Sequence, residues 1–142
     1  MYSSARKAVD TYAQVGVETG VASADPHRLI LMLFDGALAA IATARLAMSR
    51  SEVAAKTAAV TKAIAIIDGG LKASLDVAAG GELAVRLSEL YDYMLKQLLV
   101  ANLRNEVTTL DEVGRLLNEL RGAWAQIGNG KQDPVRAPGS AQ

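Results

Sequence analysis

The chain has 142 residues, of which 51% are hydrophobic, and its 15 basic residues balance its 15 acidic residues. This length fits one domain with a sizeable core, and the lack of a basic excess argues against nucleic-acid binding. The chain contains no cysteine, which excludes disulfides and thiolate metal sites. The N-terminal sequence lacks the apolar stretch of a secretory signal. The longest apolar run, residues 29–44, is interrupted by Asp35 and is shorter than the roughly 20 residues of a membrane span. We therefore expect a cytoplasmic protein without membrane insertion.

Residues 1–22 have the pattern of an apolar arm. Val9 and Tyr12 can share one face of a short helix, and valine or threonine alternates with glycine or glutamate over residues 15–21. Apolar side chains on an arm normally cover apolar surface elsewhere. The arm is either a fixed structural cover or a removable lid, because a segment held by few contacts is easily displaced.

The first predicted helix spans residues 26–49. Asp25 is suited to cap it and Pro26 to occupy its first position, where a missing N–H costs nothing. Large apolar residues fill every position from 29 to 34, which is more than one helix face can hold. We expect this helix to be buried on more than one side, and Asp35 to bond a neighbouring helix or the arm.

The second predicted helix, over residues 51–77, carries two apolar stripes about 100° apart. One stripe contains large aliphatic residues. The other contains mostly small residues, which let a neighbouring helix approach closely. Two interpretations remain open: both stripes belong to the core of a tight bundle, or the small-residue stripe is a docking groove for a foreign helix. The small-residue stripe consists of Ala59, Ala63, Ile66, Gly70, Ala73 and Val77.

Two more helices complete the prediction. Gly80 and Gly81 break the chain, and a third helix follows over residues 82–104, with Tyr91 and Leu95 beside its main apolar stripe. The last helix is expected to begin near Thr109, which has capping-box spacing to Glu112, and to end near residue 127. Residues 129–142 are expected to be disordered. Four helices with short connections predict an all-α, antiparallel four-helix bundle.

Catalytic chemistry is not indicated. His27 is the only histidine, so the Glu-x-x-His pairs of a diiron bundle cannot be formed. No nucleophile-elbow motif is present, and no lysine followed by serine or threonine comes after Gly81 to form a phosphate loop. We expect His27 to be a surface or capping residue, and we expect no enzymatic activity, metal or cofactor.

The sequence resembles the FliS-type flagellin export chaperones. The resemblance spans roughly residues 2–128, and no single motif is diagnostic, but the ordered set is specific. Phe34 stands where many members have tyrosine. The segments that carry the resemblance are residues 12–15, 25–37, 63–71, 74–76, 80–84, 87–94, 101–105 and 116–124.

The resemblance implies a cytoplasmic chaperone that binds the disordered C-terminal region of flagellin, prevents its premature polymerisation and delivers it to the export gate of the flagellar type III system. It also implies that an N-terminal arm covers an apolar groove, moves when flagellin binds and helps docking at the gate. In this sequence Val9 and Tyr12 match the arm. The expected groove residues are Ala59, Ala63, Ile66, Gly70, Ala73, Val77, Tyr91 and Leu95.

These expectations divide the chain into an arm (1–22), a four-helix bundle (23–128) and a tail (129–142). The alternative function is a structural bundle that self-assembles through the same apolar stripes, for which a tight homo-oligomer indifferent to flagellin is expected. A weak homo-oligomer is compatible with the chaperone. A partner segment laid in an apolar groove would be shielded from polymerisation by the groove itself.

Overall fold

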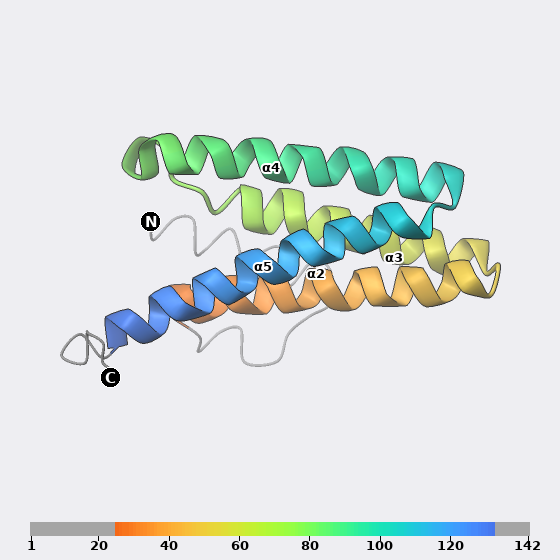
Figure 1. Ribbon diagram of the computed structural model, residues 1–142, viewed down its shortest axis with the longest axis horizontal. Coiled ribbons are helices and arrows are strands. Elements are labelled where there is room, and N and C mark those ends of the chain that lie inside the picture. Colours follow the sequence, from red (N-terminus) through yellow and green to blue (C-terminus); the bar gives the residue numbers. More distant parts are fainter. Residues whose placement is uncertain (1–24, 133–142) are drawn as a thin grey trace.

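The computed structural model describes residues 25–132, with side chains up to residue 127, and all regular structure in that range is helical. The described residues form four α-helices, and a π-helical segment continues the second of them. The helices lie side by side (Figure 1). The connections over residues 50–52, 73–76 and 105–106 are short, so consecutive helices run antiparallel. The predicted all-α four-helix bundle is confirmed. The elements are α2 (Pro26–Ser49), α3 (Val53–Ile66), the π-helix η2 (Ile67–Lys72), α4 (Val77–Arg104) and α5 (Val107–Gln132).

The predicted arm, including Val9 and Tyr12, lies outside the described residues, as does the tail from residue 133 onward. Within the described range, helical backbone continues to Gln132. The expected helix end near residue 127 is therefore wrong. Gly128 and Gly130 lower helix propensity by roughly 1 kcal/mol each, but extending an existing helix needs only one further hydrogen bond per residue.

The start of α2 is as predicted. The Asp25 carboxylate accepts a hydrogen bond from the Arg28 backbone N–H at 2.7 Å, and Pro26 occupies the first turn. α2 packs against α3, α5 and η2, which accounts for its apolar run over residues 29–34. In the described part of the chain, α2 is the one helix long and apolar enough to cross a membrane, with a mean hydropathy of 1.8. Here it is a core helix with eight buried residues.

The second predicted helix is shorter than expected and changes type. α3 passes into η2 at Ile67, and helical backbone ends at Lys72 rather than at residue 77. The Ser74 hydroxyl donates to the Gly70 carbonyl at 2.6 Å. Asp76 then caps the next helix by accepting from the Ala79 backbone N–H at 3.1 Å. Because Asp76 caps α4, the second helix must end before residue 76.

α4 therefore begins at Val77, five residues before the predicted start, but it is kinked at Gly81, where φ is +59° and ψ is −137°. That backbone conformation favours glycine because a side chain there would be strained. The predicted break is thus present as a kink within one helical segment. A Cβ added at Gly80 would lie 2.8 Å from the Ala84 side chain, so the kinked turn also needs a glycine for space.

At the other end of the bundle, a buried lysine joins α3 to the end of α4. Lys56 is 5% exposed. Its ammonium donates to the Asn102 carbonyl at 2.8 Å and to the Asn105 side-chain oxygen at 2.6 Å. Asn105 itself has left-handed backbone angles and ends α4. A cation at a helix C-terminus interacts favourably with its unpaired carbonyl groups, so Lys56 fixes the α4–α5 corner against α3.

The predicted capping box at the start of α5 is wrong. α5 begins at Val107, and the Thr109 hydroxyl donates to the Glu106 carboxylate at 2.8 Å. Glu112 accepts instead from the Tyr93 hydroxyl at 2.8 Å on α4. This hydrogen bond, together with burial, raises the pKa of Tyr93. Glu112 therefore serves helix–helix packing, because α4 presents donors that a local reading of the sequence does not reveal.

Candidate functional site

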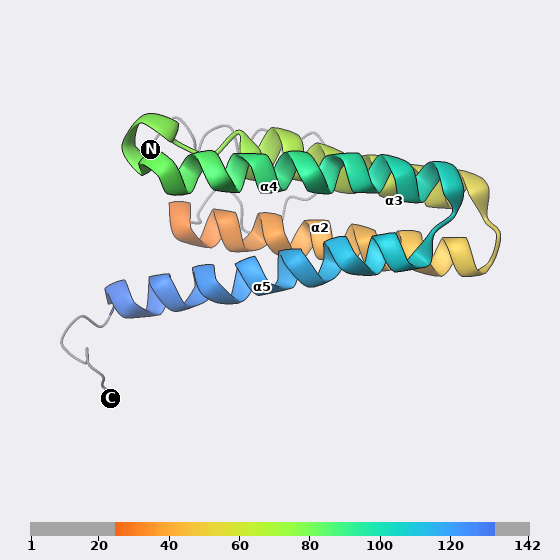
Figure 2. The same ribbon diagram turned by 45° about the horizontal axis from the view of Figure 1, so that its top comes forward.

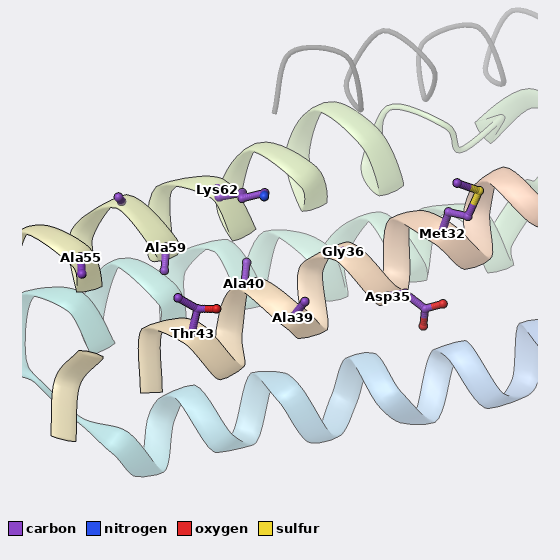
Figure 3. A pocket seen from close by; sticks show the side chains of 10 residues that line it. Met32, Asp35, Gly36, Ala39, Ala40, Thr43, Ala55, Ala59 and Lys62 are labelled. Carbon is purple, nitrogen blue, oxygen red and sulfur yellow. The ribbon is translucent and has the colours of Figure 1, made fainter. Parts of the chain in front are cut away.

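An open groove runs along the bundle surface between α2 and α3, with a volume of about 690 Å³ (Figure 3). Ala40 and Ala59 are buried where the two helices meet, whereas Ala39 and Ala58 are exposed beside them. The surface between the helices is therefore accessible along several turns. Its lining residues are Met32, Asp35, Gly36, Ala39, Ala40 and Thr43 from α2, and Ala55, Ala58, Ala59 and Lys62 from α3.

The groove is open because its walls are small. Six of the ten lining residues are alanine or glycine, so the side chains do not fill the space between the two backbones. Two charged groups mark its edges. Asp35 is paired with Arg121 of α5 at 2.5 Å, as expected for a bond to a neighbouring helix, and this pairing raises the pKa of Arg121. Lys62 forms no ion pair with any described residue. A helix with small or apolar side chains could lie in such a groove, and Lys62 could meet an acidic group on it.

A second concavity lies at the end of the bundle where α2 begins, α4 begins and α5 ends; these three helix ends lie together in Figure 2. Its volume is about 490 Å³. Helical periodicity of about 100° per residue places Ile30 and Phe34, which line this cavity, on the opposite side of α2 from Met32 and Gly36, which line the groove. The two concavities are therefore separate. The cavity is lined by Asp25, Pro26, His27, Ile30, Phe34, Leu71, Ser74, Leu75, Leu83, Leu87, Tyr91, Leu120, Ala123, Trp124 and Ile127.

The wall of this end cavity contains a histidine–tryptophan pair. The rings of His27 and Trp124 are stacked, with centroids 5.1 Å apart. The Trp124 indole N–H donates to the His27 carbonyl at 3.0 Å, and His27 Nε2 donates to the Trp124 carbonyl at 2.7 Å. His27 is thus a half-buried link between α2 and α5, rather than the surface or capping residue expected from the sequence. The pair joins α2 to α5 beside the cavity.

Tyr91 places a polar group in this otherwise apolar cavity. The residue is 4% exposed, and burial raises the pKa of its phenol. Its hydroxyl has no hydrogen-bond partner among the described residues. Buried polar groups are normally paired, so the hydroxyl is available to a group that enters the cavity. At the rim, Leu83 and Ile127 are exposed, so the apolar surface continues outward.

The eight predicted groove residues do not form one surface. Ala59 lines the α2–α3 groove and Tyr91 lines the end cavity. Ala73 and Leu95 are half-buried, and Val77 is exposed near the start of α4. The middle members of the small-residue stripe are therefore buried in the bundle. A docked helix could contact them only if a helix of the bundle moved. The buried members are Ala63, Ile66 and Gly70.

Several groove residues are not among the predicted site residues. On α2 these are Gly36, Ala39 and Ala40, and on α3 they are Ala55 and Ala58. A signal was present, because small residues also cluster just after the large apolar run of α2 and at the start of α3. An open groove requires small residues on both helices of a pair, and the predicted stripe lies on the second helix alone.

These features define a class. The described residues contain no group of three or more histidine, cysteine, aspartate or glutamate side chains that could hold a metal ion. They do contain a helical bundle with an open, small-residue groove and a separate apolar cavity. Such a molecule is equipped to hold an apolar partner segment, which is the work of a chaperone or an adaptor.

Comparisons with known proteins identify the family. Residues 8–131 match the family model described as flagellar protein FliS. The chain is 56% identical to the flagellar secretion chaperone FliS of Salmonella typhimurium over 84% of this chain and 88% of the relative. It is 46% identical to the flagellar secretion chaperone FliSB of Pseudomonas aeruginosa over 87% of this chain and 97% of that relative. It is 43% identical to the flagellar secretion chaperone FliS of Escherichia coli over 86% of this chain and 90% of that relative. The chain belongs to the FliS family, which is a family of flagellar export chaperones and not of enzymes.

Proposed function

We propose that this chain binds the C-terminal region of flagellin in the cytoplasm, keeps it from polymerising early, and delivers it to the flagellar export gate. The observation that carries the proposal is the groove between α2 and α3, which is open, lined mainly by alanine and glycine, and several helical turns long. Membership in an export-chaperone family supports a flagellar export substrate as the occupant. A partner helix laid in this groove would have its own apolar face covered and withheld from other copies.

The predicted residues enter this proposal in different ways. Ala59 lines the groove, and the Tyr91 hydroxyl can hydrogen-bond a backbone group that enters the end cavity. Val77, Ala73 and Leu95 have accessible atoms that a longer segment can cover. The remaining three are buried: Ala63 and Ile66 of α3 belong to the hydrophobic core, and Gly70 lies in η2.

The groove is tested by filling it. Ala58 is an exposed lining residue, so Ala58→Trp places an indole in the groove without disturbing the core. We expect the affinity for a flagellin C-terminal fragment, measured by titration calorimetry, to fall by at least about tenfold, because a blocked groove excludes a helix sterically. Thr61→Trp, on an exposed part of α3 outside the groove, is the matched control and should change affinity less than about twofold.

The result that would overturn the groove is a helical, folded Ala58→Trp protein that binds the fragment as tightly as the wild type does. Export is tested separately. We expect Tyr12→Ala to reduce motility more than it reduces flagellin binding, because the arm is proposed to help docking at the gate. Equal motility of this variant and the wild type would contradict that role.

A further inference from the structure

The groove between α2 and α3 is flanked by two rows of accessible residues at regular intervals. Along α2 these residues are four, three, four and three positions apart, and along α3 they are three, four and three positions apart. This is the spacing of the contact positions in a coiled coil. None of them is buried. The α2 row contains Met32, Gly36, Ala39, Thr43 and Leu46, and the α3 row contains Ala55, Ala58, Lys62 and Ala65.

The two rows are long enough to contact a third helix together. All members except Leu46 and Ala65 line the groove, and these two continue the rows by one step each. The α2 row extends from residue 32 to residue 46, which is about 21 Å of helix. α3 runs beside it in the opposite direction (Figure 3). A helix of about two heptads laid between the rows would therefore meet both of them along its length.

The bound helix must supply the bulk that fills the groove. Gly36, Ala39 and Ala58 leave the walls small, and the groove has a volume of about 690 Å³. Well-packed helix contacts set large side chains against small ones. At the end of the α2 row, Leu46 is 51% exposed and offers one large apolar contact. A helix with large aliphatic residues at its own contact positions fits these walls, whereas a helix with small residues there leaves the groove unfilled.

Lys62 gives the groove one uncompensated charge. The other charged residue among the described lining, Asp35, is paired with Arg121. Lys62 forms no ion pair with any described residue. The residues three and four positions from it, which are its neighbours on the helix surface, are alanine or isoleucine. An acidic side chain on the bound helix would be attracted to Lys62, and a basic one would be repelled.

We propose that Lys62 is a specificity-determining residue of the groove, which selects an amphipathic helix of about two heptads with large aliphatic contact residues and an acidic residue facing Lys62. The inference rests on the proposed function, because it assigns the chemistry of the segment bound in the same groove. The aliphatic residues supply most of the affinity, since ion pairs at accessible positions add little. The acidic residue decides which of several apolar helices binds, and in which register.

The charge preference is tested with two synthetic peptides of about two heptads. Both have leucine at the heptad contact positions, and they differ in one residue beside the central contact, which is glutamate in one peptide and lysine in the other. Titration calorimetry at low salt measures their binding to the full-length chain. We expect the glutamate peptide to bind at least about fivefold more tightly, and Lys62→Glu to reverse this preference. In about 1 M salt the preference should largely disappear, because exposed charges are then screened.

Two further variants control for the place of binding. Lys96→Glu makes the same charge change on an exposed position of α4, outside the groove, and should keep the wild-type preference within about twofold. Ala58→Trp fills the groove and should weaken the binding of both peptides at least about tenfold. Peptides that bind Ala58→Trp as tightly as they bind the wild type would contradict a site in the groove.

The inference is overturned if neither peptide binds the wild type, if both bind it equally, or if Lys62→Glu keeps the wild-type preference. A flagellin C-terminal fragment is titrated into the same proteins to separate this inference from the proposed function. If the fragment binds in the groove but the peptides show no charge preference, only the inference about Lys62 fails. If the peptides show the preference but the fragment does not bind, only the proposed function fails.

Discussion

Replacing Lys56 by methionine should destabilise the fold without touching the groove. Lys56 is 5% exposed and donates to the Asn102 carbonyl and the Asn105 side chain. Methionine fills a similar volume but leaves both acceptors unpaired. Hydrogen bonds to charged groups contribute about 1.5–3 kcal/mol each, and part of this is offset because the variant no longer buries a charge. We expect the free energy of unfolding to fall by about 2–3 kcal/mol.

Urea unfolding followed by circular dichroism measures this loss. With a slope of about 2 kcal/mol/M, the midpoint should fall by roughly 1–1.5 M while the slope stays unchanged. Lys62→Met, on the exposed side of the same region of α3, should shift the free energy by less than about 0.5 kcal/mol. A midpoint for Lys56→Met within about 0.3 M of the wild type would show that the two hydrogen bonds of Lys56 do not stabilise the fold.

A double-mutant cycle localises the effect. Asn105→Gly keeps the left-handed backbone but removes the side-chain acceptor. If Lys56 acts through Asn105, the two substitutions should be less than additive, with a coupling of about 0.5–2 kcal/mol. If the two losses of stability are additive, Lys56 stabilises the fold through the Asn102 carbonyl and not through Asn105.

The remaining predictions concern the end cavity, the kink and one glycine of α5. Tyr91→Phe should change stability at pH 7 by less than about 1 kcal/mol, because the hydroxyl has no partner among the described residues; a larger loss in a denaturant titration would mean that it has one. Burial raises the pKa of Tyr91 in the folded state, so above pH 10 the tyrosine ionises in the unfolded chain first. The wild type therefore loses free energy of unfolding as pH rises above about 10. Tyr91→Phe has no such group and should lose less stability than the wild type between about pH 10 and 11. Trp124→Phe should cost about 1 kcal/mol or more through the lost hydrogen bond to His27, and a thermal midpoint equal to the wild type would contradict it. Gly81→Ala should cost about 1–2 kcal/mol because its φ is +59°, whereas Gly122→Ala, in open space on α5, should stabilise by up to about 1 kcal/mol; equal midpoints of the two variants would refute the backbone argument.

Local signals predicted much of the fold because they depend on neighbouring residues only. Asp25 and Pro26 predicted where α2 begins, and the structure has both the cap and the helix end at Ser49. The glycine pair at 80–81 predicted a break, which is present as a kink. The capping box predicted from Thr109 and Glu112 is wrong, because a residue distant in the sequence binds Glu112 instead. Its carboxylate accepts a hydrogen bond from Tyr93 on α4.

The candidate site was predicted less well, for a physical reason. A periodic pattern defines the faces of a helix but does not say which neighbour covers each face. Both stripes of the second helix have interior members, because α3 and η2 contact both α2 and α4. The open surface lies partly on Ala55 and Ala58, beside the predicted stripe, and its other wall is supplied by α2.

By itself, the sequence determined the helical class, the number of helices in the described range, the family resemblance and the apolar character of α2. The helical class, the number of helices and the apolar character of α2 follow from composition, spacing and capping, which act over a few residues. The resemblance rests instead on an ordered set of segments along the chain. Tertiary structure alone decided that Gly36 and Ala58 share an open groove, that His27 and Trp124 join two helix ends 97 residues apart, and that Lys56 is buried. Each depends on how helices distant in the sequence pack together, because packing determines which surfaces remain accessible.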